Sequence, residues 1–178
     1  MQRNDSYKGE KGEYFMYTVG IITASDKGSR GEREDKSGVV IREIMEAKGY
    51  EVKCYRIIAD EQHLLEEAMI QMADQDKVNL ILTTGGTGFS LRDRTPEATI
   101  TVCDRMAPGI PEAMRAYSLQ ITNRAMLSRA VAGIRNQTLI VNMPGSPKAV
   151  KESLECILEP LFHGIAILLG DTGECARK

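Results

Sequence analysis

The sequence predicts an α/β protein: a three-layer α/β/α sandwich built on a mainly parallel sheet. Short apolar segments rich in β-branched residues and leucine alternate with longer segments whose apolar residues recur at helical spacing. The length of 178 residues suits one domain with a sizeable core. Polar or glycine-rich loops follow three of the predicted strands, and open parallel sheets bind their ligands at that edge.

The composition along the chain indicates where this domain begins and ends, and it argues against a nucleic-acid-binding, membrane or secreted protein. We expect one domain over residues 16–170, a flexible polar tail over 1–15 and a short tail over 171–178. The net charge of −2 gives no reason to expect nucleic acid or an anionic membrane. No apolar run approaches the roughly 20 residues of a membrane helix, and no signal peptide is evident. Four scattered cysteines and two distant histidines favour a cytoplasmic protein with reduced thiols and no zinc site.

The domain is predicted to open with a buried strand over residues 17–24, followed by a long polar loop over 25–35. A helix follows, for which Asp35 or Ser37 is the candidate N-cap and Gly49 the C-terminal stop. One face of this helix is apolar: Val40, Ile41, Ile44 and Met45.

A second strand is predicted over residues 51–59, and Asp60 then looks like the N-cap of another helix. Local sequence alone favours that capping role over a catalytic one. The core face of this second helix is Leu64, Leu65, Ala68, Met69 and Met72. A third strand, over 78–84, leads into the stretch around which the chain is organised.

That stretch is Gly-Gly-Thr-Gly over residues 85–88, followed by three charged residues over 92–94. Glycines let the backbone turn sharply and bring its amides close to a ligand, so the loop predicts an anion site. A plain tight turn is the alternative. The loop matches neither the P-loop spacing nor the dinucleotide fingerprint. Thr95 is the candidate N-cap of the next helix, with Pro96 at its first position.

The rest of the chain repeats the alternation. The predicted elements are a helix over 95–106, a helix over 110–123, a short strand over 130–134 and a strand over 138–142. The last strand runs into a loop over 142–146, and Ser146 caps a final helix that Pro160 should kink or split. Right-handed crossovers would place this loop, the loop over 25–35 and the loop over 85–93 on one edge of the sheet.

Taken together, these loops resemble those of the MogA/MoaB family of molybdenum-cofactor biosynthesis proteins, which includes the gephyrin G domain. The resemblance covers residues 17–169 and makes 16–170 a MoaB/Mog-like molybdopterin-binding domain. The motifs that carry it are Ser25-Asp26, Asp35-x-Ser37-Gly38, Ala59-Asp60-Glu61, Thr84-Gly85-Gly86-Thr87-Gly88, Arg92-Asp93-x-Thr95-Pro96-Glu97-Ala98-Thr99, Pro108-Gly109 and Asn142-x-Pro144-Gly145-Ser146-Pro147.

The resemblance implies a molybdopterin adenylyltransferase, which joins AMP from ATP to the terminal phosphate of molybdopterin and releases pyrophosphate. It implies Mg²⁺, a trimer or hexamer, and delivery of the product to a molybdenum-insertion enzyme. It also makes Asp60 and Asp93 the catalytic residues and candidate Mg²⁺ ligands. The residues it implies for substrate and phosphate binding are Ser25, Asp26, Thr84, Gly85, Gly86, Thr87, Gly88, Arg92, Thr95, Asn142, Pro144, Gly145 and Ser146.

Several alternatives remain open from the sequence. Arg92 either offsets pyrophosphate charge or is a solvated loop residue, and the phosphate held by the glycine loop is that of the pterin or those of ATP. The chain is short, which fits a non-catalytic MoaB-like binding protein; molybdopterin binding without ATP consumption would identify it. An assembly role would need an attached domain or linker, and none is evident. An unrelated nucleotide enzyme on the same fold is disfavoured by the combined motifs.

Overall fold

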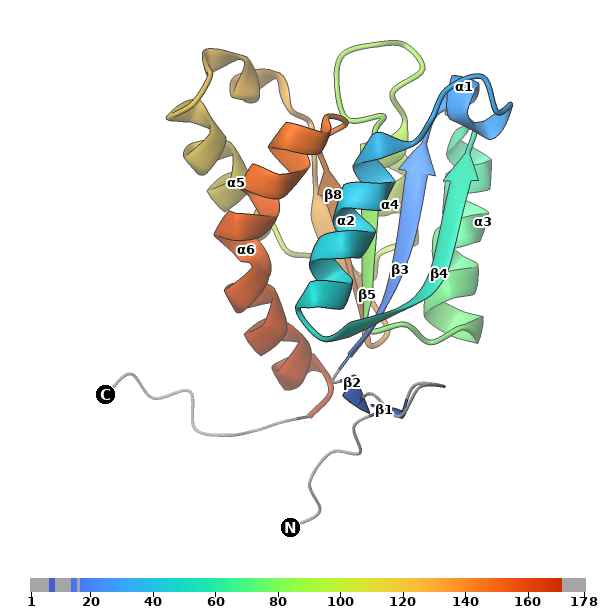
Figure 1. Cartoon of the computed structure of the whole chain (residues 1–178), viewed down its shortest axis with the longest axis vertical. Coiled ribbons are helices and arrows are strands. Elements are labelled where there is room, and N and C mark those ends of the chain that lie inside the picture. The colour runs from blue at the N-terminus through green and yellow to red at the C-terminus, as the bar shows by residue number, and fades with distance from the viewer. Residues whose placement is uncertain (1–6, 9–13, 16, 171–178) are drawn as a thin grey trace.

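The computed structural model describes residues 7–8, 14–15 and 17–170, and its main body is a six-stranded sheet between two layers of helices (Figure 1). The strands lie in the order β4 (Tyr50–Ile58), β3 (Tyr17–Ala24), β5 (Leu80–Thr84), β8 (Thr138–Met143), β7 (Ala132–Arg135) and β6 (Arg105–Met106). The first four are parallel to one another, β7 pairs antiparallel with β8, and β6 pairs antiparallel with β7. The predicted three-layer, mainly parallel fold is confirmed.

Helices cover both faces of the sheet. One face packs against α2 (Lys36–Ala47), α5 (Gly109–Leu119) and α6 (Pro147–Leu168). The other packs against α3 (Gln62–Ile70), its π-helical continuation η1 (Gln71–Gln75), and α4 (Thr95–Val102). A single-turn helix, α1 (Asp26–Ser29), and a 3₁₀ helix, η2 (Asn123–Leu127), lie in connections. In the described part of the chain, no helix is long and apolar enough to cross a membrane.

The two cores follow from the alternation of side chains along the central strands. Neighbouring residues of one strand point to opposite faces, so each strand feeds both cores. Ile21, Leu82 and Val141 are buried under α2, α5 and α6, and Ile22, Ile81 and Ile140 are buried under α3 and α4. Burial on both faces explains why these strands appear in the sequence as continuous apolar runs.

The predicted tails lie mostly outside the described residues. Within 1–15, Tyr7–Lys8 (β1) and Tyr14–Phe15 (β2) pair as two short antiparallel strands. The whole of the predicted tail over 171–178 lies outside the described part of the chain.

Two of the predicted helix caps are confirmed. The Asp35 carboxylate accepts a hydrogen bond from the Gly38 amide at 2.9 Å, so Asp35 rather than Ser37 caps α2. The Ser146 hydroxyl accepts from the Ala149 amide at 3.2 Å at the start of α6. Helix α6 runs through Pro160 as one continuous element and is therefore not split.

Two other predicted caps are wrong, because the side chains bond to distant segments instead. Helix α3 begins at Gln62 after Glu61, and the Asp60 carboxylate accepts from the Asp26 amide. Thr95 is already inside α4, and its hydroxyl donates to the Gly85 carbonyl at 3.0 Å.

The predicted helix over 95–106 is too long. Helix α4 ends at Val102, and Arg105–Met106 instead form the edge strand β6. These two residues pair with Ile134 and Gly133 of β7. A strand of two residues has no hydrophobic pattern of its own, so local sequence did not reveal it.

The central strands should carry much of the stability. Ile81 is fully buried at the centre of β5, so Ile81→Ala should lower the free energy of unfolding by about 2–5 kcal/mol through lost burial and an unfilled cavity. The matched control is Ile100→Ala on α4, where the side chain is 52% exposed and the loss should be below about 0.5 kcal/mol. Urea denaturation measures both, and equal losses would contradict the assignment of the core.

Candidate functional site

The three loops singled out from the sequence meet at one edge of the sheet. Strands β3, β5 and β8 are parallel, with Thr23 opposite Thr84 and Thr84 opposite Met143. The segments that follow these strands therefore begin side by side, at the top of the sheet in Figure 1. A polar cavity of about 620 Å³ opens there. Its lining includes the predicted residues Ser25, Asp60, Thr84, Gly85, Gly86, Asp93 and Gly145.

The glycine loop has a backbone that other residues adopt only with strain. Gly85 and Gly86 have φ angles of +87° and +65°, in the left-handed region. A Cβ on Gly85 would collide with the carbonyl oxygen of Ala24, and one on Gly86 would collide with the Thr95 hydroxyl. Thr84 completes the arrangement, because its hydroxyl donates to the Pro144 carbonyl at 2.7 Å. This bond ties the start of the glycine loop to the loop over 142–146.

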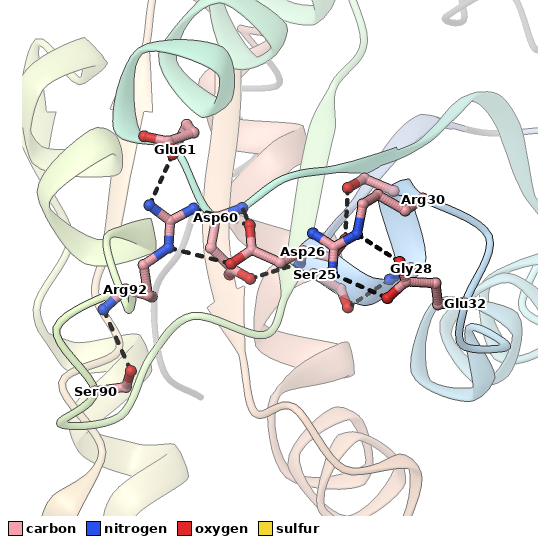
Figure 2. Close-up of polar contacts among 10 residues, drawn as sticks. Ser25, Asp26, Gly28, Arg30, Glu32, Asp60, Glu61, Ser90 and Arg92 are labelled. Atoms are coloured by element: carbon pink, nitrogen blue, oxygen red, sulfur yellow. Dashed lines mark hydrogen bonds and ion pairs between the residues drawn. The ribbon is translucent and has the colours of Figure 1, made fainter.

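Asp26 and Asp60 are held by reciprocal hydrogen bonds (Figure 2). The Asp26 amide donates to Asp60 Oδ2 at 2.8 Å, and the Asp60 amide donates to Asp26 Oδ1 at 3.0 Å. Arg92 lies over this pair. Its Nε and Nη2 donate to the Asp26 carboxylate at 3.1 and 2.9 Å, and its Nη1 donates to Glu61 at 2.7 Å. Arg92 therefore links the charged loop to the starts of α1 and α3, and is not a free solvated residue.

The two aspartates have opposite electrostatic situations. Hydrogen bonds from Arg92 and from the Asp60 amide hold the pKa of Asp26 below its usual range. Burial raises the pKa of Asp60, and the charges of Asp26 and Asp93 raise it further, against the hydrogen bond from the Asp26 amide. The negative charge of Asp60 is therefore incompletely compensated within the protein. A cation bound nearby would favour its ionised form.

Asp93 faces the same cavity from the opposite loop. Its Oδ2 accepts a hydrogen bond from the Ser90 amide at 2.9 Å. A Cβ on Gly88 would lie only 2.9 Å from the same oxygen, so glycine at this position leaves room for the carboxylate. The structure thus brings together the two acidic residues that the resemblance singles out, Asp60 and Asp93.

Some predicted binding residues lie outside this cavity. Asn142 is fully buried: its amide donates to the hydroxyls of Thr83 and Thr99 at 3.0 and 2.8 Å, and its oxygen accepts from the Val131 amide at 3.2 Å. All of these contacts are internal, so its side chain supports the site from beneath, and contact of Asn142 with substrate stays a prediction. The predicted residues Asp26, Thr87, Gly88, Arg92, Thr95, Pro144 and Ser146 do not line the cavity either; Thr87, Gly88 and Pro144 line a neighbouring one of about 300 Å³.

A hydroxyl cluster around Asp35, on the wall of the cavity, was not predicted from the sequence. Asp35 Oδ2 accepts hydrogen bonds from the hydroxyls of Thr23 and Tyr55, each at 2.5 Å. Burial and the hydrogen bond to Asp35 raise the pKa of Tyr55, so the phenol stays protonated. Ser37 adds a bond from its hydroxyl to the Gly145 carbonyl at 2.8 Å. The position of Asp35 before a predicted helix indicated that its side chain makes hydrogen bonds. No local pattern indicated that Tyr55, on β4, would be one of its partners.

Two cations were also missed. Arg33 and Lys36 line the cavity at the start of α2, together with Glu34, whose carboxylate lies 4.0 Å from the Lys36 ammonium. The charged composition of residues 25–35 was the available signal, although it did not identify which side chains face the cavity. Among the described residues, no group of three or more histidine, cysteine or acidic side chains is placed to hold a metal ion.

The fold and this site define an α/β protein with a polar, partly acidic cavity at the carboxyl edge of a parallel sheet. Residues 20–164 match the sequence profile of a family described as "Probable molybdopterin binding domain". The chain belongs to this molybdopterin-binding domain family, as its resemblance to MogA/MoaB proteins predicted.

Individual relatives support the same assignment. A molybdopterin adenylyltransferase from Helicobacter pylori (strain ATCC 700392 / 26695) is 44% identical over 164 residues, which are 90% of this chain and 92% of that protein. The molybdopterin adenylyltransferase of Escherichia coli (strain K12) is 40% identical over 154 residues, 83% of this chain and 78% of the relative. The crystal structure of the molybdopterin biosynthesis enzyme MoaB from Thermus thermophilus superposes with a TM-score of 0.82 at 48% identity, covering 87% of this chain and 98% of that one.

The raised pKa of Asp60 predicts an effect on stability. A carboxylate whose pKa is raised by folding contributes stability below about pH 3.8, and that contribution is lost as the pH rises through the folded pKa. Asp60→Asn keeps an acceptor for the Asp26 amide but removes the buried charge. We therefore expect Asp60→Asn to raise Tm at pH 7 and to leave it unchanged at pH 3, as followed by circular dichroism. A lower Tm at pH 7 would contradict the account of the charge.

Proposed function

We propose that this protein is a molybdopterin adenylyltransferase of molybdenum-cofactor biosynthesis. It transfers AMP from ATP to the terminal phosphate of molybdopterin and releases pyrophosphate. The observation that carries the proposal is the meeting of Asp60 and Asp93 in one cavity beside the Gly85–Gly88 loop. Relatives that bear this enzyme's name are aligned over 83–90% of the chain.

The chemistry suits such a cavity. An oxygen of the molybdopterin phosphate attacks the α-phosphorus of ATP, the bond from that phosphorus to the bridging oxygen breaks, and pyrophosphate leaves with the electron pair. A phosphate monoester has a second pKa of about 6, so it is largely ionised at pH 7 and needs little help from a base. Repulsion between this anion and the triphosphate is the main obstacle, and positioning with charge neutralisation overcomes it.

The cavity supplies groups for both tasks. The amides of Gly85 and Gly86 and the side chains of Arg33 and Lys36 line this cavity and are suited to phosphate oxygens. Arg92 keeps Asp26 neutralised at the edge of the site.

Magnesium fits the two aspartates. Mg²⁺ is commonly held by one or two carboxylates together with substrate phosphates and water, so it does not require a cage of three protein ligands. Asp60 is a carboxylate with incompletely compensated charge, and Asp93 faces the same space. When bound, Mg²⁺ would neutralise phosphate charge. Asp60 and Asp93 would hold it or orient its waters.

The finer parts of the proposal rest on the family resemblance. They are ATP as the nucleotide, a trimer or hexamer, a cytoplasmic location and delivery of the product to a molybdenum-insertion enzyme. The non-catalytic MoaB-like alternative is disfavoured, because the Helicobacter pylori and Escherichia coli relatives are both named molybdopterin adenylyltransferase.

The test is the Asp93→Asn variant. We expect turnover, measured as adenylylated molybdopterin and pyrophosphate formed from molybdopterin, ATP and Mg²⁺, to fall by about 100-fold or more, because a charged group that positions cation and phosphates is lost. Molybdopterin binding and Tm should change little, since the Asn side chain can still accept from the Ser90 amide.

A matched control is Asp104→Asn at the far edge of the sheet. The Asp104 carboxylate accepts a hydrogen bond from the Asn136 backbone amide at 2.7 Å, as the Asp93 carboxylate does from the Ser90 amide. Asp104 does not line the cavity. Its turnover should stay within about three-fold of the wild type. Normal turnover in Asp93→Asn would rule out the role given to Asp93, and binding of molybdopterin by the wild type without ATP consumption would favour the binding-protein alternative.

A further inference from the structure

The segment that carries Asp93 has little packing of its own. Between Gly88 and Asp93, the side chains of Phe89 and Leu91 are 70% and 89% exposed. Its internal bonds, Ser90 amide to Asp93 Oδ2 at 2.9 Å and Asp93 amide to Ser90 carbonyl at 3.0 Å, fix the turn but not its position on the domain. The half-exposed side chain of Arg92 ties the turn to Asp26 and Glu61, and a second contact holds the backbone at both ends of the turn.

Arg129, in the connection between η2 and β7, makes that contact. Its Nε donates to the Gly88 carbonyl at 2.6 Å and its Nη2 donates to the Asp93 carbonyl at 2.6 Å. Its Nη1 pairs with the Glu97 carboxylate on α4. Its own amide donates to the Thr87 carbonyl at 3.0 Å. One side chain therefore fastens both ends of the turn and joins them to a helix.

The geometry requires a guanidinium. Arginine presents several N–H donors in one rigid plane, so it can satisfy two carbonyls and a carboxylate at once. A lysine ammonium carries a similar charge at a single point on a flexible stem and cannot reproduce this fork. Arg129 does not line either of the two cavities beside the glycine loop, so it is not placed to contact a substrate bound there.

We propose that Arg129 is a positioning residue for adenylyl transfer: it fixes the backbone of Gly88 and Asp93 so that the Asp93 carboxylate faces Asp60 across the cavity. This role rests on the proposed function. Loss of the fork frees the backbone at both ends of the turn, which Arg92 then holds by its side chain alone, and this displaces Asp93 without removing any group that binds substrate.

Arg135 offers a matched control at the other end of β7. Its guanidinium also combines an ion pair, with Asp74, and a bond to a backbone carbonyl, that of Val102 at 2.9 Å. Neither contact involves the loops of the site. Arg129→Lys and Arg135→Lys thus remove the same kind of interaction, and only the first releases the turn.

The first measurement is steady-state kinetics of the full chain with molybdopterin, ATP and Mg²⁺. We expect Arg129→Lys to lower kcat by about 100-fold while both KM values change by less than about three-fold, because misplacement of a catalytic group by about 1 Å has effects of this size. Arg135→Lys should keep kcat within about three-fold. A merely structural role would predict similar kcat values in the two variants.

The second measurement does not depend on turnover. Amide hydrogen exchange of residues 88–94 should be at least about ten-fold faster in Arg129→Lys than in the wild type and unchanged in Arg135→Lys. Faster exchange together with the loss of kcat supports the proposal. Unchanged exchange, or faster exchange with normal kcat, overturns it. If the wild type itself shows no turnover, the proposed function fails, and exchange alone then decides whether Arg129 anchors the turn.

If Arg129→Lys does not melt cooperatively, Glu97→Gln takes its place. This variant keeps the guanidinium and its carbonyl bonds but removes the charge that orients it. We expect exchange of residues 88–94 to rise and kcat to fall, by about five-fold each, with KM unchanged. Wild-type values for both quantities in Glu97→Gln would overturn the proposal.

Discussion

The parallel register of β3, β5 and β8 is the constraint on which the site depends. Since the three strands end level with one another, the segments that follow them must share one edge of the sheet. Hydrogen bonds then lock these segments together, from Thr84 to the Pro144 carbonyl and from Ser37 to the Gly145 carbonyl. Residues more than 100 positions apart therefore form one cavity, and the hydrophobic cores beneath hold it rigid.

Charge within this rigid frame is left partly unbalanced. Arg92 neutralises Asp26, whereas Asp60 is half-buried between like charges with a raised pKa. An arrangement of this kind opposes folding at neutral pH and favours the binding of a cation with its phosphate ligands. The same separation of roles extends to the loop of Asp93, whose carboxylate faces the cavity while its carbonyl is held from outside by Arg129.

Local sequence patterns predicted most strands, most helices and the meeting of the loops, because burial and turn chemistry are local signals. The predictions from local sequence that were wrong have one physical cause. Asp60 and Thr95 look like helix caps, yet their side chains bond to Asp26 and Gly85, which only the folded chain brings close. The hydrogen bonds from Tyr55 to Asp35 and from Arg129 to the Gly88 carbonyl also depend on tertiary structure. The periodicity of the sequence therefore did not predict them. The roles of Asp60 and Asp93 came from family resemblance, not from spacing.

The central claim is that this edge of the sheet joins a nucleotide to a pterin phosphate. The most direct test mixes the wild-type protein with molybdopterin, Mg²⁺ and ATP labelled at the α-phosphorus. The account predicts that the label moves to the pterin in equal amount to the pyrophosphate released, and that chelation of Mg²⁺ stops both. Label that stays with ATP while molybdopterin binds, or that appears as free AMP with the pterin unchanged, would contradict it.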